Sequence, residues 1–207
     1  MNSHTLRQLV AGPAGQIECA LDAPAAQACG VAVVCHPHPQ HGGTMDNKVA
    51  QTLARAFVQI GHRAVRFNFR GVGASQGRWD DGRGEIDDAL AVIAAHRDPV
   101  LPLLLAGFSF GAYVASQAAT QLADDAKPRR LVLIGPSTQK QQVAPVPADT
   151  IVIHGEVDEV VPLAATLDWA RPQALPVIVF PGVGHFFHGQ LALLRNVLVR
   201  QLQRPAH

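Results

Sequence analysis

The sequence has little net charge and no block of charge of one sign. Its 17 lysines and arginines nearly balance its 16 aspartates and glutamates, which leaves a formal net charge of +1. Proteins that bind a nucleic-acid backbone or an acidic membrane surface usually gather lysine and arginine together, and this sequence shows no such gathering. We therefore expect neither nucleic acid nor a membrane among its partners.

Cysteines and long apolar runs are scarce as well. The three cysteines, Cys19, Cys29 and Cys35, are an odd number without regular spacing, which argues against a disulfide framework and for a reducing compartment. The first seven residues lack the basic segment and apolar run of a signal peptide, so no export is expected. Apolar runs such as residues 103–106 are far shorter than the roughly 18 residues that span a bilayer. We expect a cytoplasmic protein.

The chain does have the apolar content that a buried core requires. Hydrophobic residues make up 48% of the 207 residues and charged residues 16%, a balance that excludes intrinsic disorder. At about 150 residues per domain, this length predicts one domain covering residues 1–207. No internal repeat is visible, and the linker-like stretch 136–149 is too short to be a domain.

Short runs rich in Val, Ile and Leu predict strands along the whole chain. Most are uninterrupted rather than alternating, which is typical of strands covered by helices on both faces. Near the N-terminus, two further runs flank Gly12-Pro13-Ala14-Gly15 and predict an antiparallel hairpin. The eight predicted strands are residues 5–11, 16–21, 31–35, 64–67, 103–106, 131–134, 151–153 and 177–180.

Segments with helical spacing or composition lie between these strands. Strands that alternate with helices build a parallel sheet through right-handed crossovers. We therefore predict an α/β fold with an eight-stranded, mostly parallel sheet, the N-terminal antiparallel hairpin and helices on both faces. The predicted helices are residues 48–60, 85–96, 112–122 and 162–170, with Pro162 in the first turn of the last, and a C-terminal helix carrying Leu191, Leu194 and Leu198.

The string Gly107-Phe108-Ser109-Phe110-Gly111 fits the nucleophile-elbow pattern of glycine, any residue, serine, any residue, glycine. It stands between a predicted strand and a predicted helix, which is the context that the pattern requires. The two glycines leave room for a turn so tight that side chains would collide with the neighbouring backbone. The competing interpretation is a chance match to a short pattern.

A serine hydroxyl needs a base, and the base needs an acid to orient it. Asp158 follows the predicted strand 151–153, and His185 follows the predicted strand 177–180. Serine, acid, histidine is the chain order that a nucleophile elbow of this kind predicts. Ligands generally bind at the carboxyl edge of an open parallel sheet, so all three side chains are expected to meet there.

Other side chains compete for two of these roles. Glu156 and Glu159 flank Asp158, and either could be the acid or a solvated surface charge. His188 is a second choice for the base, because three residues after His185 it could share the same helical face. A histidine at a helix start or in a pocket wall is the favoured interpretation of His188.

A tetrahedral intermediate also needs two backbone N–H donors. The residue after the nucleophile, Phe110, would supply one. In the loop His36-Pro37-His38-Pro39, the prolines have no N–H and stiffen the backbone, so His38 is the expected second donor.

Two further motifs carry rival interpretations. His36, His38 and His41 could ligate zinc, because imidazole is a common zinc ligand, although Gln40 stands where the His-x-His-x-Asp-His signature of the metallo-β-lactamase fold has an acid. The glycine-rich stretch 71–77 superficially resembles a dinucleotide-binding turn, but Gln76 replaces its last glycine, and a turn-forming role is favoured. Arg70 beside it is interpreted as a structural ion-pair residue.

Together with the elbow, Asp158, His185 and the His36 loop, the strings from Gly42 to Lys48 and from Phe67 to Gly73 make the chain resemble the α/β-hydrolases. Within that superfamily it resembles small lidless bacterial serine hydrolases related to the dienelactone hydrolase and esterase branches. The resemblance implies Ser109 as nucleophile, Asp158 and His185 as its partners, and an oxyanion hole near His38 and Phe110. Serine replaces the cysteine of dienelactone hydrolases, which argues against dienelactone as substrate.

We therefore expect a serine hydrolase that cleaves small carboxylic esters or thioesters through an acyl-enzyme, with no cofactor and no metal. Two alternatives remain: a metal-dependent hydrolase using His36, His38 and His41, and a non-catalytic binding protein with a hydrolase fold. No cap domain fits between residues 134 and 150, where prolines disfavour a long helix. Short acyl groups are therefore expected.

Overall fold

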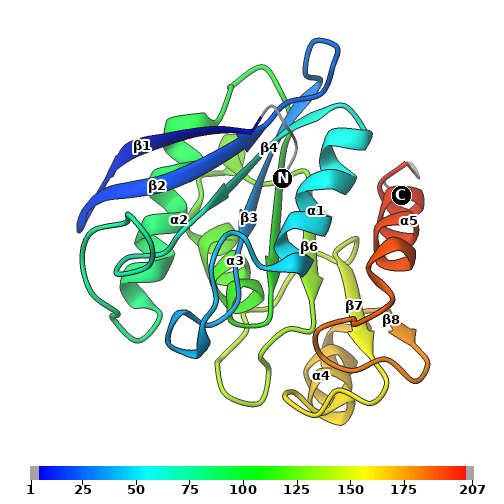
Figure 1. The fold of residues 1–207 in the computed structure, drawn as a ribbon. Coiled ribbons are helices and arrows are strands. Elements are labelled where there is room, and N and C mark those ends of the chain that lie inside the picture. Colours follow the sequence, from blue (N-terminus) through cyan, green and yellow to red (C-terminus); the bar gives the residue numbers. More distant parts are fainter. Residues whose placement is uncertain (1–4, 204–207) are drawn as a thin grey trace.

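The computed structural model describes residues 5–203, and Figure 1 shows their arrangement. Residues 1–4, which form part of the stretch interpreted as lacking a signal peptide, lie outside the described residues. Among the helices of residues 5–203, none is long and apolar enough to cross a membrane.

All eight predicted strands are present in one sheet. In chain order they are β1 (Leu6–Gly12), β2 (Gly15–Asp22), β3 (Gly30–Cys35), β4 (His62–Phe67), β5 (Leu103–Phe108), β6 (Arg130–Ile134), β7 (Ile151–Gly155) and β8 (Val177–Phe180). In space they follow the order β1-β2-β4-β3-β5-β6-β7-β8. Strand β2 pairs antiparallel with both β1 and β4, and the remaining pairings are parallel.

Five α-helices cover the sheet on both faces (Figure 1). Helices α1 (Lys48–Gln59) and α5 (Leu191–Leu202) pack on one face against alternate side chains of the central strands. Helices α2 (Arg83–His96), α3 (Phe110–Gln121) and α4 (Leu163–Ala170) pack on the other. Because the central strands are buried on both faces, their apolar runs do not alternate with polar residues.

Element boundaries differ from the predictions mainly around the elbow. Strand β5 continues through Phe108 and α3 begins at Phe110, two residues before the predicted start, so Ser109 alone separates strand from helix. Helix α2 also begins two residues early, because Glu85 accepts hydrogen bonds from the backbone N–H of Gly82 and secures its first turn. Pro162 stands just before α4 rather than in its first turn.

The segment between β6 and β7 contains no helix, in agreement with the prediction that no cap is inserted there. The predicted hairpin is also present, with Pro13 and Ala14 between β1 and β2 and with Gly15 at a φ of 114°. The parallel strands β3, β5, β7 and β8 end at the same edge of the sheet, and the loops that follow them carry the predicted site residues.

Candidate active site

Ser109 occupies a strained turn at the centre of this edge. Its φ is 56° and its ψ is −119°, a backbone conformation that side-chain-bearing residues rarely adopt and that surrounding structure must enforce. A Cβ at Gly107 would collide with the backbone of Gly111, and a Cβ at Gly111 would collide with the carbonyl oxygen of Cys35. The two glycines are therefore required for the strand and the helix to approach this closely.

Ser109, His185 and Asp158 lie in one chain of hydrogen-bond contacts. The Oγ of Ser109 is 3.0 Å from Nε2 of His185, and Nδ1 of His185 is 2.6 Å from Oδ2 of Asp158. His185 lies 76 residues after Ser109 and 27 residues after Asp158 in the sequence. All three side chains are buried. This arrangement allows a proton to pass from the serine hydroxyl to the imidazole while the carboxylate faces the ring from behind.

The carboxylate of Asp158 is held from both sides. Its Oδ1 accepts hydrogen bonds from the backbone N–H groups of Val160 and Val161, at 2.9 and 2.8 Å. Burial on its own would raise the pKa of Asp158, but the hydrogen bonds from His185 and from these two N–H groups hold that pKa below its usual value. Asp158 is therefore ionised at neutral pH.

The two competing acids and the second-choice base lie elsewhere. Glu156 is exposed and accepts a hydrogen bond from the backbone N–H of Gly182, and Glu159 is also exposed. Residues 181–190 form turns rather than a helix, so His188 and His185 do not share a helical face. Its ring instead lies beside that of Phe186 on the surface.

Packing fixes the ring of His185. The ring centroid of Phe108 lies 4.8 Å from it and that of Phe186 lies 5.1 Å away. Gly135, with a φ of 48°, brings the loop after β6 against the same pair, because a Cβ there would lie 3.4 Å from the imidazole and 3.6 Å from Oδ2 of Asp158. Sequence reasoning missed Gly135, since its only signal is its position at the end of a predicted strand.

The loop after β3 lies beside the start of α3. The ring of His38 contacts that of Phe110, with centroids 5.0 Å apart, so the two predicted donor residues are neighbours. The carbonyl oxygen of His38 accepts hydrogen bonds from the N–H groups of His41 and Gly43, which closes the loop into a tight turn. The N–H of Phe110 belongs to the first turn of α3, where N–H groups have no acceptor within the helix.

Half-buried aromatic side chains flank these two residues, and the sequence analysis did not single them out. The ring of Trp79 lies 4.7 Å from His38 and 5.1 Å from Phe110, and the ring of Tyr113 lies 5.7 Å from Phe110. The ring of His41 stacks on that of His38, with centroids 4.4 Å apart. No local pattern could have identified this cluster, because Trp79 comes from the long loop before α2.

The three histidines of this loop do not form the alternative metal site. His36 is fully buried and both its ring nitrogens are engaged: Nδ1 donates to the carbonyl oxygen of Pro37 at 2.6 Å, and Nε2 accepts from the N–H of Phe69 at 3.1 Å. Burial lowers the pKa of His36 to about 3, so the ring is neutral. Within residues 5–203, no group of three His, Cys, Asp or Glu side chains has the geometry of a metal site. The alternative interpretation as a zinc site was wrong, because both ring nitrogens of His36 bond to backbone groups.

The glycine-rich stretch 71–77 after β4 forms turns, which confirms the turn-forming role favoured over dinucleotide binding. Gly71, Gly73 and Gly77 all have positive φ, between 57° and 91°. Arg70 forms the predicted ion pair, with its guanidinium 2.8 Å from the buried carboxylate of Asp88 on α2.

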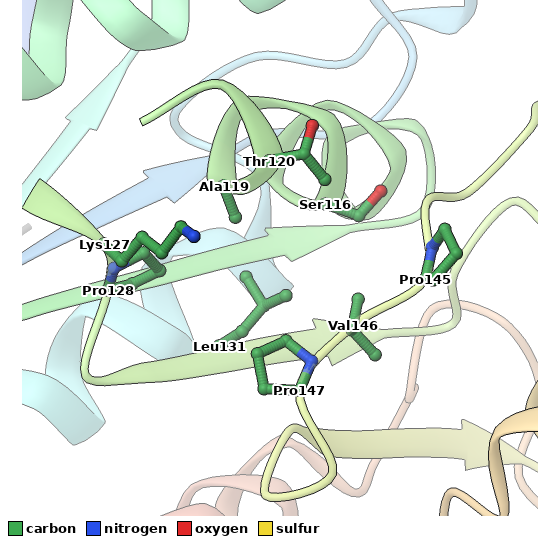
Figure 2. Close-up of a pocket in the computed structure, with 9 residues that line it drawn as sticks. All are labelled: Ser116, Ala119, Thr120, Lys127, Pro128, Leu131, Pro145, Val146 and Pro147. Carbon is green, nitrogen blue, oxygen red and sulfur yellow. The ribbon is translucent and has the colours of Figure 1, made fainter. Parts of the chain in front are cut away.

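A separate cavity of about 410 Å³ lies on the α3 side of the sheet (Figure 2). Its walls are mainly apolar side chains from α3, the start of β6 and the proline-rich segment before β7. None of them belongs to the predicted catalytic or oxyanion residues, so this cavity is distinct from the candidate site. The lining residues are Ser116, Ala119, Thr120, Lys127, Pro128, Leu131, Pro145, Val146 and Pro147.

Comparison with known proteins places the chain in a family. Residues 27–149 match the family model Hydrolase_4, described as serine aminopeptidase, S33. An uncharacterized protein of Rickettsia prowazekii is 33% identical over 159 residues, which are 72% of this chain and 66% of that protein.

Two solved structures are similar over nearly the full length. A serine hydrolase of Xanthomonas campestris, described as an α/β serine hydrolase without lid, is 38% identical with a TM-score of 0.90, covering 100% of this chain and 98% of that one. A structure from Coxiella burnetii, described as an α/β serine hydrolase homologue, is 40% identical with a TM-score of 0.84 and covers 98% of both chains. The chain therefore belongs to the lidless α/β serine hydrolases, in the family whose model is described as serine aminopeptidase, S33.

Proposed function

We propose that this hydrolase cleaves small carboxylic esters or thioesters, with Ser109 as nucleophile, His185 as general base and Asp158 as the acid that orients it. The observation that carries the proposal is the continuous contact from Ser109 Oγ through His185 to Asp158, at 3.0 and 2.6 Å. A small-molecule ester is the proposed partner, and the reaction needs no cofactor.

The proposed reaction proceeds in two halves. His185 Nε2 takes the proton of the Ser109 hydroxyl as its oxygen attacks the ester carbonyl, and the carbonyl oxygen becomes an oxyanion. That oxyanion accepts hydrogen bonds from the backbone N–H groups of His38 and Phe110. The proton then passes from His185 to the departing alcohol or thiol, which leaves an acyl group on Ser109. Water, deprotonated by the same imidazole, releases the acid and restores the serine.

A fluorophosphonate probe followed by peptide mass spectrometry tests this proposal directly, because it reacts only with an activated serine. We expect label on the peptide that contains Ser109 and none on the Ser109→Ala variant. Label on a different serine of the unmodified protein would overturn the assignment. Absence of label, together with unchanged ester hydrolysis in Ser109→Ala, would overturn it as well. Full activity in EDTA is expected as well, because the proposed steps use no metal.

The substrate class requires its own comparison, since the family model bears the description of an aminopeptidase. Initial rates on p-nitrophenyl acetate, a short acyl thioester and an amino-acid p-nitroanilide should be compared at equal enzyme concentration. We expect hydrolysis of the first two and little of the third. Cleavage of the anilide alone would assign the chain to peptide substrates. Binding of esters without turnover would favour the non-catalytic alternative.

A further inference from the structure

Strand β7 ends beside the site with a histidine that the proposed mechanism does not use. His154 is fully buried, and it lies four residues before Asp158. Its register partner across the sheet is Val179 of β8. Because side chains alternate along a strand, His154 shares the face of Val152, against which α4 packs. Burial of a polar ring costs free energy, so its partners decide what it does there.

The contacts of His154 determine its tautomer. Its Nε2 lies 2.9 Å from the carbonyl oxygen of Val161, which can only accept a hydrogen bond. Nε2 therefore carries the hydrogen, and Nδ1 is left with a lone pair. Among the described residues, Nδ1 is buried without a hydrogen-bond partner. The ring orientation that allows Nε2 to donate to Val161 therefore leaves Nδ1 without a hydrogen bond.

The nitrogen that donates to Val161 also lies close to the proposed catalytic acid. Nε2 of His154 lies 3.3 Å from Oδ2 of Asp158, the oxygen that accepts from Nδ1 of His185 at 2.6 Å. The other oxygen, Oδ1, is already taken by two backbone N–H groups. Oδ2 therefore accepts its hydrogen bond from His185, and the Nε2–H group of His154 lies beside the same oxygen.

His154 is a neutral donor. Burial lowers its pKa, and this effect exceeds the opposite influence of the Val161 carbonyl and the Asp158 carboxylate. The titratable groups that act on it are Asp158 and His185. Strand β8 has no titratable side chain, and Asp168 of α4 is exposed beside Arg171. A neutral N–H can stabilise the carboxylate without cancelling the charge that faces His185.

The geometry points to His154 as a positioning residue whose Nε2–H group lies beside Oδ2 of Asp158 and sets how strongly the carboxylate attracts the proton of the imidazole. This inference rests on the proposed function. The partial positive charge of that N–H group offsets part of the negative charge of Oδ2. Without it, the carboxylate would hold a proton on His185 more firmly, so the base would become available only at higher pH.

The test is the pH dependence of kcat/KM for p-nitrophenyl acetate in the full chain. In His154→Phe, which keeps a ring but has no donor, the midpoint of the acid limb is expected to move up by about half a pH unit. In His154→Gln the amide nitrogen can occupy the place of Nε2, so the midpoint should return to that of the unmodified protein. In His154→Asn the amide reaches only the place of Nδ1, and the shift should match that of His154→Phe. If the Phe variant fails to fold, the Asn and Gln pair carries the comparison.

A general loss of stability would not produce this pattern. His96, a buried histidine on α2 that contacts Gln8, provides the matched control: His96→Phe should lower the melting temperature but leave the pH profile unchanged. In an Asp158→Asn background, His154→Phe should shift nothing further, because the carboxylate charge beside the N–H group of His154 is then absent.

The outcomes separate this inference from the proposed function. Unchanged midpoints in both His154→Phe and His154→Asn, or equal shifts in His154→Phe and His154→Gln, would overturn the role of His154 while Ser109→Ala still abolishes activity. If Ser109→Ala keeps its activity, the proposed function itself is overturned.

Discussion

Two loops at the carboxyl edge of the sheet each begin near a buried histidine, and the two histidines differ in their partners. His36, directly after β3, is bonded to backbone through both ring nitrogens. His154, near the end of β7, donates through Nε2 to the carbonyl oxygen of Val161, and this nitrogen lies 3.3 Å from Oδ2 of Asp158. Its Nδ1 has no hydrogen-bond partner among the described residues. Both histidines are fully buried, but His36 stabilises the backbone of its loop, whereas His154 lies beside the proposed catalytic acid.

The comparison extends to how each loop would serve the reaction. The loop after β3 offers the backbone N–H of His38 and is shaped by Pro37 and Pro39, so its proposed contribution does not depend on a catalytic side chain. The loop after β7 offers the carboxylate of Asp158. Replacing the side chain of Asp158 should therefore lower activity strongly, whereas replacing the side chain of His38 should lower it little. Five predictions test this difference, ordered from the largest expected effect to the smallest.

The largest loss is expected where side chains do the chemistry. Ser109→Ala and His185→Ala should each lower kcat/KM for p-nitrophenyl acetate by about four orders of magnitude or more, with the melting temperature nearly unchanged. Because nucleophile and base act as one unit, the double variant should be little worse than either single one. Losses that multiply would mean that the two residues act independently.

Asp158→Asn tests the side-chain half of the comparison. We expect a loss of about three to four orders of magnitude in kcat, because an amide cannot stabilise the imidazolium that forms during attack. Glu156→Gln is the control, since its carboxylate is exposed and bonds only to the Gly182 N–H among the described contacts. A near-normal rate in Asp158→Asn would shift the acid to Glu156 or Glu159.

The backbone half of the comparison is tested by Gly43→Ala against His38→Ala. A Cβ at Gly43 would overlap the carbonyl oxygens of Pro37 and His38, so the loop must move and the proposed donor moves with it. We expect a loss of about a hundredfold in kcat for Gly43→Ala, as for removal of one oxyanion donor. His38→Ala retains the N–H and should show only a small loss. A large loss in His38→Ala would assign a role to the imidazole itself.

His36→Gln tests whether the first buried histidine is structural. Because the pKa of His36 is lowered to about 3, the unfolded chain binds one more proton than the folded chain between pH 6.5 and pH 3. The free energy of unfolding should therefore fall as pH drops through this window, with His36 contributing about 2 kcal/mol between pH 6.5 and pH 5. Urea unfolding at several pH values should give a shallower fall in His36→Gln. An equal slope in both proteins would show that His36 is not the neutral buried base described here.

The smallest effect concerns a third loop, the segment between β6 and β7, which has no helix to cover a long acyl chain. Each methylene gains roughly 0.8 kcal/mol only when it is fully buried. We expect p-nitrophenyl acetate and butyrate to be cleaved with a higher kcat/KM than the palmitate ester, without activation by a lipid–water interface. A preference for palmitate, or a rise in rate above the critical micelle concentration, would show that some other segment covers the site.

Sequence patterns predicted the structure correctly where residues close together in the chain determine a strand or a turn. Short apolar runs identified six strands, the turn residues 12–15 identified the hairpin of the other two, and the string around Ser109 identified the strand-to-helix turn. The start of α3 was missed by two residues, because composition does not reveal that a single residue separates β5 from the helix. The possibility that His188 shares a helical face with His185 was wrong, because residues 181–190 form turns.

The sequence by itself determined the α/β architecture, the elbow and the order of serine, acid and histidine, because these depend on short-range periodicity and on residue types at fixed spacing. Only the tertiary structure decided which buried histidine lies beside Asp158, and which rings surround His38. Those contacts join side chains from different loops, and a hydrogen bond of a few ångströms depends on where the folded strands end. No pattern within a single segment contains that information.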